Sequence, residues 1–213
     1  MNKFHLVFTK ITGFIPARIF FKWKVYYEPG AEKGKKLPKG SILMSNHRSI
    51  WDFILYLMVF FRTTVRFQVA EVIYEKNAFI AWVLKSFGSI RVNRFDFDFS
   101  FIEESEKILK DGERVGIFPE GQLPRGGKMS RFTPSCALIA LRSGADIIPV
   151  YTDGNYGLFK RTHLIIGRKI SLRQFCGTED LSKEILRSCN DHLLGRILEL
   201  EAELKRQMER KKR

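Results

Sequence analysis

The sequence predicts an α/β domain in which helices cover a mixed β-sheet. From residue 41 onward, short apolar runs alternate with longer segments whose apolar residues recur at helical spacing. The chain has 213 residues, 45% of them hydrophobic. It is therefore long enough to bury the core of one domain and too apolar for a disordered chain.

The first segment, residues 4–24, predicts an N-terminal amphipathic helix that Pro16 interrupts. Its basic flanks are typical of a helix that lies on a membrane surface. A helix packed on its own domain is the alternative. We therefore divide the chain into residues 1–24, a membrane-associating segment, and residues 25–213, a single domain that ends in a helix.

Residues 28–40 combine Gly, Pro and Lys without periodicity, which indicates an exposed loop. Residues 95–101 alternate apolar and polar side chains, but we expect a loop there that leads into a helix capped by Asp98 or Ser100. Strands are expected at residues 41–45, 65–70, 89–92, 114–118, 146–151 and 163–166, and helices at residues 50–61, 78–87, 101–110, 135–143 and 185–208.

Positive charge is concentrated at the two ends of the chain. Residues 1–39 hold nine Lys or Arg and two Glu, and residues 205–213 hold six Lys or Arg and one Glu, so the ends supply +12 of the net +14. A basic balance suits nucleic acid or an anionic membrane surface. Because we find neither base-stacking motifs nor a recognition helix, we expect no nucleic acid as partner. Two solvated basic ends are the simplest alternative.

The cysteines Cys136, Cys176 and Cys189 are widely spaced in the sequence. This spacing argues against a zinc site and a disulfide framework, and favours a reducing compartment. The longest strongly apolar run, residues 53–61, is far shorter than the ~20 residues of a membrane-spanning helix. We therefore expect a peripheral (monotopic) protein on the cytoplasmic face of a membrane.

A candidate catalytic pair, His47 and Asp52, directly follows the first expected strand. Five residues apart, they do not share a face of one helix. If the helix begins near Ser49, the preceding turn can fold the imidazole back toward the carboxylate. Such a pair acts as an oriented general base on a hydroxyl. Alternatively, Ser49 and Asp52 form a capping box, and Asp52 only caps the helix.

A second candidate feature, Phe-Pro-Glu-Gly at residues 118–121, ends the strand expected at residues 114–118. Its carboxylate, Glu120, therefore lies at the carboxyl end of a strand, where α/β sheets place functional groups.

Four blocks together resemble the glycerolipid acyltransferase family, in particular 1-acylglycerol-3-phosphate acyltransferases. They are NHRSIWD at 46–52, GSIRVNR at 88–94, FPEG at 118–121 and IIPVY at 147–151. The resemblance covers roughly residues 25–170.

The resemblance implies a role for each matching residue. His47 is the general base, Asp52 orients it, Arg94 binds the acceptor's phosphate, and Glu120 and Gly121 line the acceptor site. The chain departs from the family after Gly121, where Gln122 and Leu123 stand in place of Thr-Arg. Arg125 is expected to substitute for the missing arginine.

The activity implied is transfer of a fatty acyl group from an acyl thioester, acyl-CoA or acyl carrier protein, to the free hydroxyl of 1-acylglycerol 3-phosphate. No cofactor and no metal are needed, and we expect backbone N–H groups near the start of the 50–61 helix to stabilise the oxyanion. The alternatives are the same fold acting on glycerol 3-phosphate or another lysophospholipid and, from a different class, a basic nucleic-acid-binding module.

Overall fold

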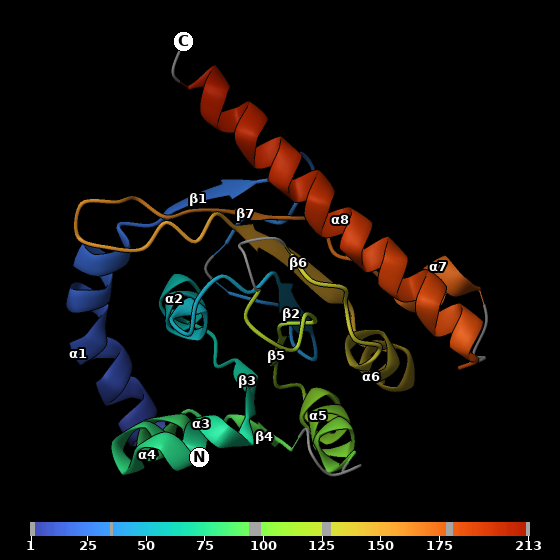
Figure 1. Cartoon of the computed structure of the whole chain (residues 1–213), viewed down its shortest axis with the longest axis horizontal. Helices are drawn as coiled ribbons and strands as arrows, with labels where there is room; N and C mark the ends of the chain where they lie inside the picture. The colour runs from blue at the N-terminus through green and yellow to red at the C-terminus, as the bar shows by residue number, and fades with distance from the viewer. Residues whose placement is uncertain (1–2, 35, 94–98, 125–128, 178–180, 212–213) are drawn as a thin grey trace.

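A seven-stranded sheet forms the centre of the structure, a computed structural model that describes residues 3–34, 36–93, 99–124, 129–177 and 181–211 (Figure 1). The strand order is β1-β7-β6-β2-β5-β3-β4. All paired strands run parallel except β6 and β7, which are antiparallel, so the expected mixed sheet is confirmed. The strands are β1 (Lys24–Tyr27), β2 (Ile42–Ser45), β3 (Arg66–Ala70), β4 (Ile90–Val92), β5 (Val115–Ile117), β6 (Ile147–Thr152) and β7 (His163–Ile166).

Helices cover both faces of this sheet (Figure 1). They are α1 (Lys3–Phe21), α2 (Asp52–Val59), α3 (Glu71–Lys76), α4 (Ala78–Ser86), α5 (Ser100–Lys110), α6 (Ser135–Ser143), α7 (Leu172–Cys176) and α8 (Lys183–Arg210). Alternate residues of β2 divide between the two cores: Leu43 packs with α1 and α2, whereas Ile42 and Met44 pack with α5, α6 and α8. This alternation is the period of two that a strand buried on both faces requires.

The six strands and five helices expected after residue 40 are all present, and no end differs from the predicted one by more than two residues. The edge strand β1 and the short helices α3 and α7 were not predicted. Each has only four to six residues, too few for a periodic pattern to emerge. The N-cap of α5 is Phe99 and not Ser100, and Asp98 lies outside the described residues.

Helix α1 continues through Pro16, so the expected interruption is wrong. A proline removes one helical hydrogen bond, and the exposed Pro16 keeps its ring on the outer side of the helix. On the inner side, Ala17 and Phe21 are buried in the core that contains α2. The packing of these two side chains after the proline offsets the lost bond.

A buried cation also fixes α1 to the rest of the fold. The Lys10 ammonium group donates to the carbonyls of Phe61 at 3.0 Å and Thr63 at 2.7 Å. Burial lowers the pKa of Lys10 from 10.5 to about 8. The opposite face of the helix is an exposed apolar stripe consisting of Val7, Phe8, Ile11, Ile15 and Ile19. Among the described residues, no helix is both long and apolar enough to cross a bilayer.

The structure brings together two of the three cysteines that the sequence separates. The sulfur atoms of Cys176 and Cys189 lie 2.7 Å apart, and both cysteines are free thiols. Burial, together with the Cys176 thiol, raises the pKa of Cys189 to about 12. The two cysteines are 13 residues apart in the sequence, and the packing of α7 on α8 brings them together.

Candidate active site

The carboxyl ends of β2 and β6 are joined at Asn46, the first residue after β2. Its side-chain amide donates to the Thr152 carbonyl at 3.0 Å and accepts the Thr152 N–H at 2.9 Å. Asn46 is fully buried, so these two bonds are shielded from water. The turn that follows therefore begins from a fixed point at the edge of the sheet.

The expected contact between His47 and Asp52 is present. Imidazole Nδ1 lies 2.7 Å from carboxylate Oδ2, and Asp52 has no exposed surface. Because a carboxylate only accepts hydrogen bonds, Nδ1 carries the proton and Nε2 has a free lone pair. About a fifth of the His47 side chain (19%) remains exposed, which leaves the imidazole reachable. The geometry is that of an oriented general base.

Asp52 also closes the turn that holds His47. Its Oδ2 accepts the N–H groups of Arg48 at 2.6 Å and Ser49 at 2.9 Å. The bond from Ser49 is half of the capping box considered as the alternative, although the N-cap of α2 is Trp51. One carboxylate therefore both closes the turn and orients the imidazole. The N–H groups of Arg48 and Ser49 point at Asp52, so these two do not serve the oxyanion role expected near this helix start.

Aromatic rings support the imidazole from one side. His47 stacks on Phe118, with ring centroids 4.3 Å apart and planes at 13°. Phe118 stacks in turn on Phe67 at 5.5 Å. The ring of Phe67 lies over Gly116 of β5, where any Cβ would come within 2.4 Å of it. A glycine at this point of β5 is thus what lets the aromatic stack reach His47.

The carboxylate of Glu120 is buried and bound to two backbone groups. Oε1 accepts the N–H of His47 at 2.7 Å, and Oε2 accepts the N–H of Ser130 at 2.8 Å. Gly121 turns the chain with φ +68°, a left-handed conformation that favours glycine. Glu120 therefore joins the His47 turn to the segment that contains Ser130. Contact of Glu120 or Gly121 with an acceptor stays a prediction.

Sequence reasoning missed Tyr156, which lies in the loop between β6 and β7. Its hydroxyl donates to Oδ1 of Asp52, the carboxylate oxygen that the turn leaves open. Burial, and next the charge of Asp52, hold the pKa of Tyr156 far above its ordinary value, so the phenol keeps its proton. A single tyrosine in a loop carries no periodic signal, and only the fold brings it to Asp52.

The two arginines predicted to bind phosphate, Arg94 and Arg125, lie outside the described residues. Pro149, in the fourth block, is buried within β6, and its carbonyl accepts the N–H of Gly167 at 2.9 Å. No group of three or more His, Cys, Asp or Glu side chains within the described ranges is arranged to hold a metal ion.

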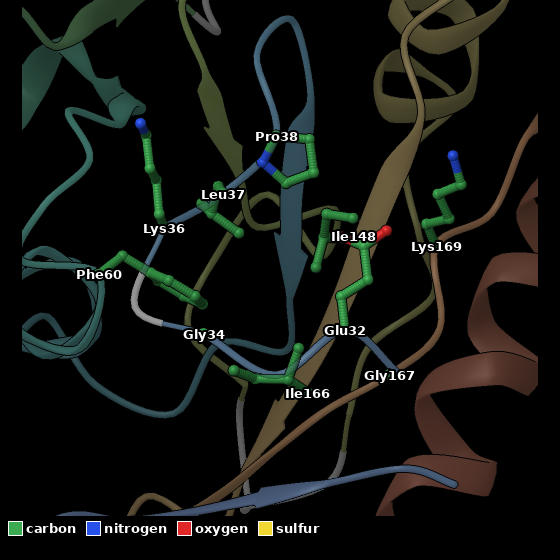
Figure 2. A pocket seen from close by; sticks show the side chains of 10 residues that line it. All are labelled: Glu32, Gly34, Lys36, Leu37, Pro38, Phe60, Ile148, Ile166, Gly167 and Lys169. Atoms are coloured by element: carbon green, nitrogen blue, oxygen red, sulfur yellow. The ribbon is translucent and has the colours of Figure 1, made fainter. Parts of the chain in front are cut away.

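A small hollow, shown in Figure 2, lies near the amino ends of β2 and β6. His47 follows the other end of β2. Leu37 and Pro38, which precede β2, line the hollow together with Ile148 near the start of β6. Its volume of about 30 Å³ admits one or two water molecules. None of the predicted site residues lines it.

Comparison with known proteins finds one matching family model, described as Acyltransferase, over residues 31–153. The chain is similar to the 1-acyl-sn-glycerol-3-phosphate acyltransferase of Borreliella burgdorferi, with 31% identity over 128 residues, 57% of this chain and 50% of that protein. It is also similar to the protein of the same name from Bacillus subtilis, with 28% identity over 170 residues, 78% of this chain and 83% of that protein. The chain thus spans about half the length of the Borreliella burgdorferi relative.

A solved structure has the same fold. The 1-acyl-sn-glycerophosphate (LPA) acyltransferase PlsC from Thermotoga maritima matches with a TM-score of 0.61, covering 92% of this chain and 78% of that chain. Because the sequence identity is 22%, this likeness concerns the fold.

Proposed function

Because the matching family model spans residues 31–153, the chain belongs to the acyltransferase family, and we propose that it acylates 1-acylglycerol 3-phosphate to give phosphatidate in phospholipid synthesis. The observation that carries this proposal is the His47–Asp52 pair, with Nδ1 bound to the buried carboxylate. The names of the relatives from Borreliella burgdorferi and Bacillus subtilis support the choice of acceptor.

The proposed reaction needs no nucleophile from the protein. Nε2 of His47 takes the proton of the acceptor hydroxyl, whose oxygen attacks the carbonyl carbon of the acyl thioester. Collapse of the tetrahedral intermediate breaks the C–S bond, and the thiolate leaves with the proton held by His47. The charge of Asp52 stabilises the imidazolium between these two steps. The acyl donor is acyl-CoA or acyl carrier protein, and no cofactor takes part.

Recognition of the acceptor's phosphate is assigned to Arg94, with Arg125 in place of the arginine missing after Gly121. A guanidinium offers a bidentate fork to a phosphate. Arg94→Ala and Arg125→Ala should each raise the KM for the acceptor and leave the KM for the thioester unchanged. Equal rises for both substrates would contradict these assignments.

The proposed location is the cytoplasmic face of a membrane, where α1, within the 1–24 membrane-associating segment, lies on the anionic surface. Support comes from the exposed apolar stripe of α1 and from the +7 net charge of residues 1–39. A lipid acceptor and a lipid product suit this location.

The test is an acyl transfer assay in detergent solution with purified protein, both donors, and three acceptors: 1-acylglycerol 3-phosphate, glycerol 3-phosphate and lysophosphatidylcholine. We expect phosphatidate as the product, formed about 10²-fold to 10⁴-fold more slowly by His47→Ala. If the protein prefers either of the other two acceptors, the acyl transfer mechanism stands and the proposed acceptor is wrong. Absence of transfer to all three with either donor would overturn the proposal.

A further inference from the structure

The loop between β6 and β7, residues 153–162, returns to the edge of the sheet that carries His47, because β7 runs antiparallel to β6. Two interactions close its base. Nδ1 of His163 lies 2.8 Å from Oδ2 of Asp153, and the Thr162 hydroxyl donates to the Asn155 carbonyl at 2.9 Å. These two bonds hold the start and the end of the loop together, so the loop projects from the sheet with fixed ends.

Two large apolar side chains stand at the tip of this loop. Phe159 is 99% exposed and Leu158 is 53% exposed. Neither contributes to the two hydrophobic cores, so folding does not explain them. Lys160 and Arg161 follow directly and are exposed as well. An apolar tip beside cations is the composition of a segment that enters a bilayer below its headgroups.

The loop is attached to the C-terminal end of α1, as Figure 1 shows. The Gly157 N–H donates to the Phe20 carbonyl at 3.3 Å, and the Thr162 N–H donates to the Phe21 carbonyl at 3.1 Å. The tip and the exposed stripe of α1 therefore belong to one body.

Between the loop and α1 lies a basic hollow lined by Arg18, Lys22, Trp23, Lys24 and Arg161. Four of these five side chains are cations, which complements the phosphate of a lipid headgroup. Lys22 has φ +44°, a left-handed conformation that ends α1 and in which glycine is far more usual. Glycine would adopt this backbone conformation without strain. The presence of lysine instead indicates that its charged side chain has a function.

From these observations we infer that Leu158, Phe159 and the basic hollow form, with α1, one docking surface for an anionic bilayer. Leu158 and Phe159 enter the acyl region, while Arg18, Lys22, Lys24 and Arg161 bind headgroup phosphates. The inference rests on the proposed function, which gives the protein a lipid substrate, and it adds a second membrane contact beyond α1. The same loop carries Tyr156, so the contact lies three residues from the side chain that binds Asp52.

The test is co-sedimentation of the full chain with two kinds of vesicle, phosphatidylcholine alone and phosphatidylcholine mixed with phosphatidate. Phe159→Ser should weaken partitioning into both by about 10-fold or more, because a buried aromatic side chain is lost. Arg161→Glu should weaken partitioning about 10-fold into the anionic vesicles only. Lys22→Gly should weaken it about 5-fold there without lowering the melting temperature, since glycine relieves the left-handed backbone.

Matched controls are Leu198→Ser, an exposed leucine of α8, and Lys110→Glu, an exposed lysine at the end of α5. Both should bind like the wild type. Phe159→Ser should acylate a detergent-dispersed acceptor at the wild-type rate and a vesicle-borne one about 10-fold more slowly at low lipid concentration. Unchanged binding by Phe159→Ser and Leu158→Ser, or an equal loss by the controls, would overturn the inference. If even the wild type transfers no acyl group in detergent, the proposed function fails, while the vesicle result still decides the docking surface.

Discussion

Replacing Asp52 by asparagine separates the two roles that the structure gives this carboxylate. Asp52 accepts four hydrogen bonds: from His47, Arg48 and Ser49 onto Oδ2, and from Tyr156 onto Oδ1. In Asp52→Asn, the amide oxygen can take the Oδ2 position and keep the first three donors. The amide NH₂ then faces Tyr156, whose hydroxyl oxygen can accept. The turn and the imidazole tautomer are therefore retained, and only the negative charge is lost.

The expected loss in rate follows from that charge. At ~4 Å and an effective dielectric constant of about 20, an imidazolium and a carboxylate attract by about 4 kcal/mol, which is an upper limit. Replacing a charged hydrogen bond by a neutral one costs about 1 kcal/mol, which is a lower limit. We therefore expect kcat to fall by about 5-fold to 10³-fold. Asp52→Ala is the matched control, because it leaves two backbone N–H groups and Tyr156 without their acceptor and should lower stability by about 3 kcal/mol or more.

The assay pairs initial rates of acyl transfer with chemical denaturation of the same preparations. Asp52→Asn should keep most of the stability and lose most of the rate, whereas Asp52→Ala should lose both. The reasoning is refuted if Asp52→Asn turns over within a few-fold of the wild type while its stability falls as far as that of Asp52→Ala. Asp52 would then serve only to close the turn.

His47→Ala should lower kcat by about 10² to 10⁴ with an unchanged melting curve, because a positioned general base is lost; activity within a few-fold of the wild type would contradict the mechanism. Glu120→Gln leaves one acceptor for the N–H groups of His47 and Ser130, so kcat should fall about 10-fold; a rise in acceptor KM alone would instead favour contact with the acceptor. Tyr156→Phe keeps the ring on Phe21 but removes a bond to a buried charge, and should destabilise the fold by about 1.5–3 kcal/mol in denaturation; an unchanged midpoint would rule that bond out. Because the pKa of Lys10 is lowered to about 8, the unfolded chain binds more protons between pH 8 and 10.5. The free energy of unfolding of the wild type should therefore rise across that window relative to Lys10→Met, by at most about 3 kcal/mol, and a constant difference would show that Lys10 does not titrate there.

The elements that the sequence predicted are those with a long or strongly apolar pattern. The period of α8 is an example: seven apolar residues recur at helical spacing there. Five of them are buried, and Ile185 and Met208 are half-buried; the buried ones are Cys189, Leu193, Ile197, Leu200 and Leu204. The turn that joins His47 to Asp52 was also predictable, because both partners lie within seven residues of sequence. Features formed by residues that are close together in the sequence could therefore be predicted from the sequence.

What could not be predicted depends on contacts between distant segments. Lys10 is one of the basic residues of the first segment, and its sequence neighbours do not reveal that it points inward to two carbonyls. Glu120 is predicted to line the acceptor site, but its sequence neighbours do not reveal that its carboxylate binds the backbone of His47, 73 residues away. Tyr156 carries no motif at all. Each of these side chains acquires its environment only when the sheet brings its segments together.

The pairing of Asn46 with Thr152 has a consequence for the order in which the protein is built. The two residues are 106 positions apart, and Tyr156 is 104 positions from Asp52. Contacts of such long sequence separation form late, because the intervening chain must first close into a loop. A growing chain that has reached residue 130 already contains the whole His-to-Asp turn, but neither the strand that anchors it nor the tyrosine that completes it. Activity is therefore expected to appear only when the β6–β7 hairpin docks, as one of the last events of folding.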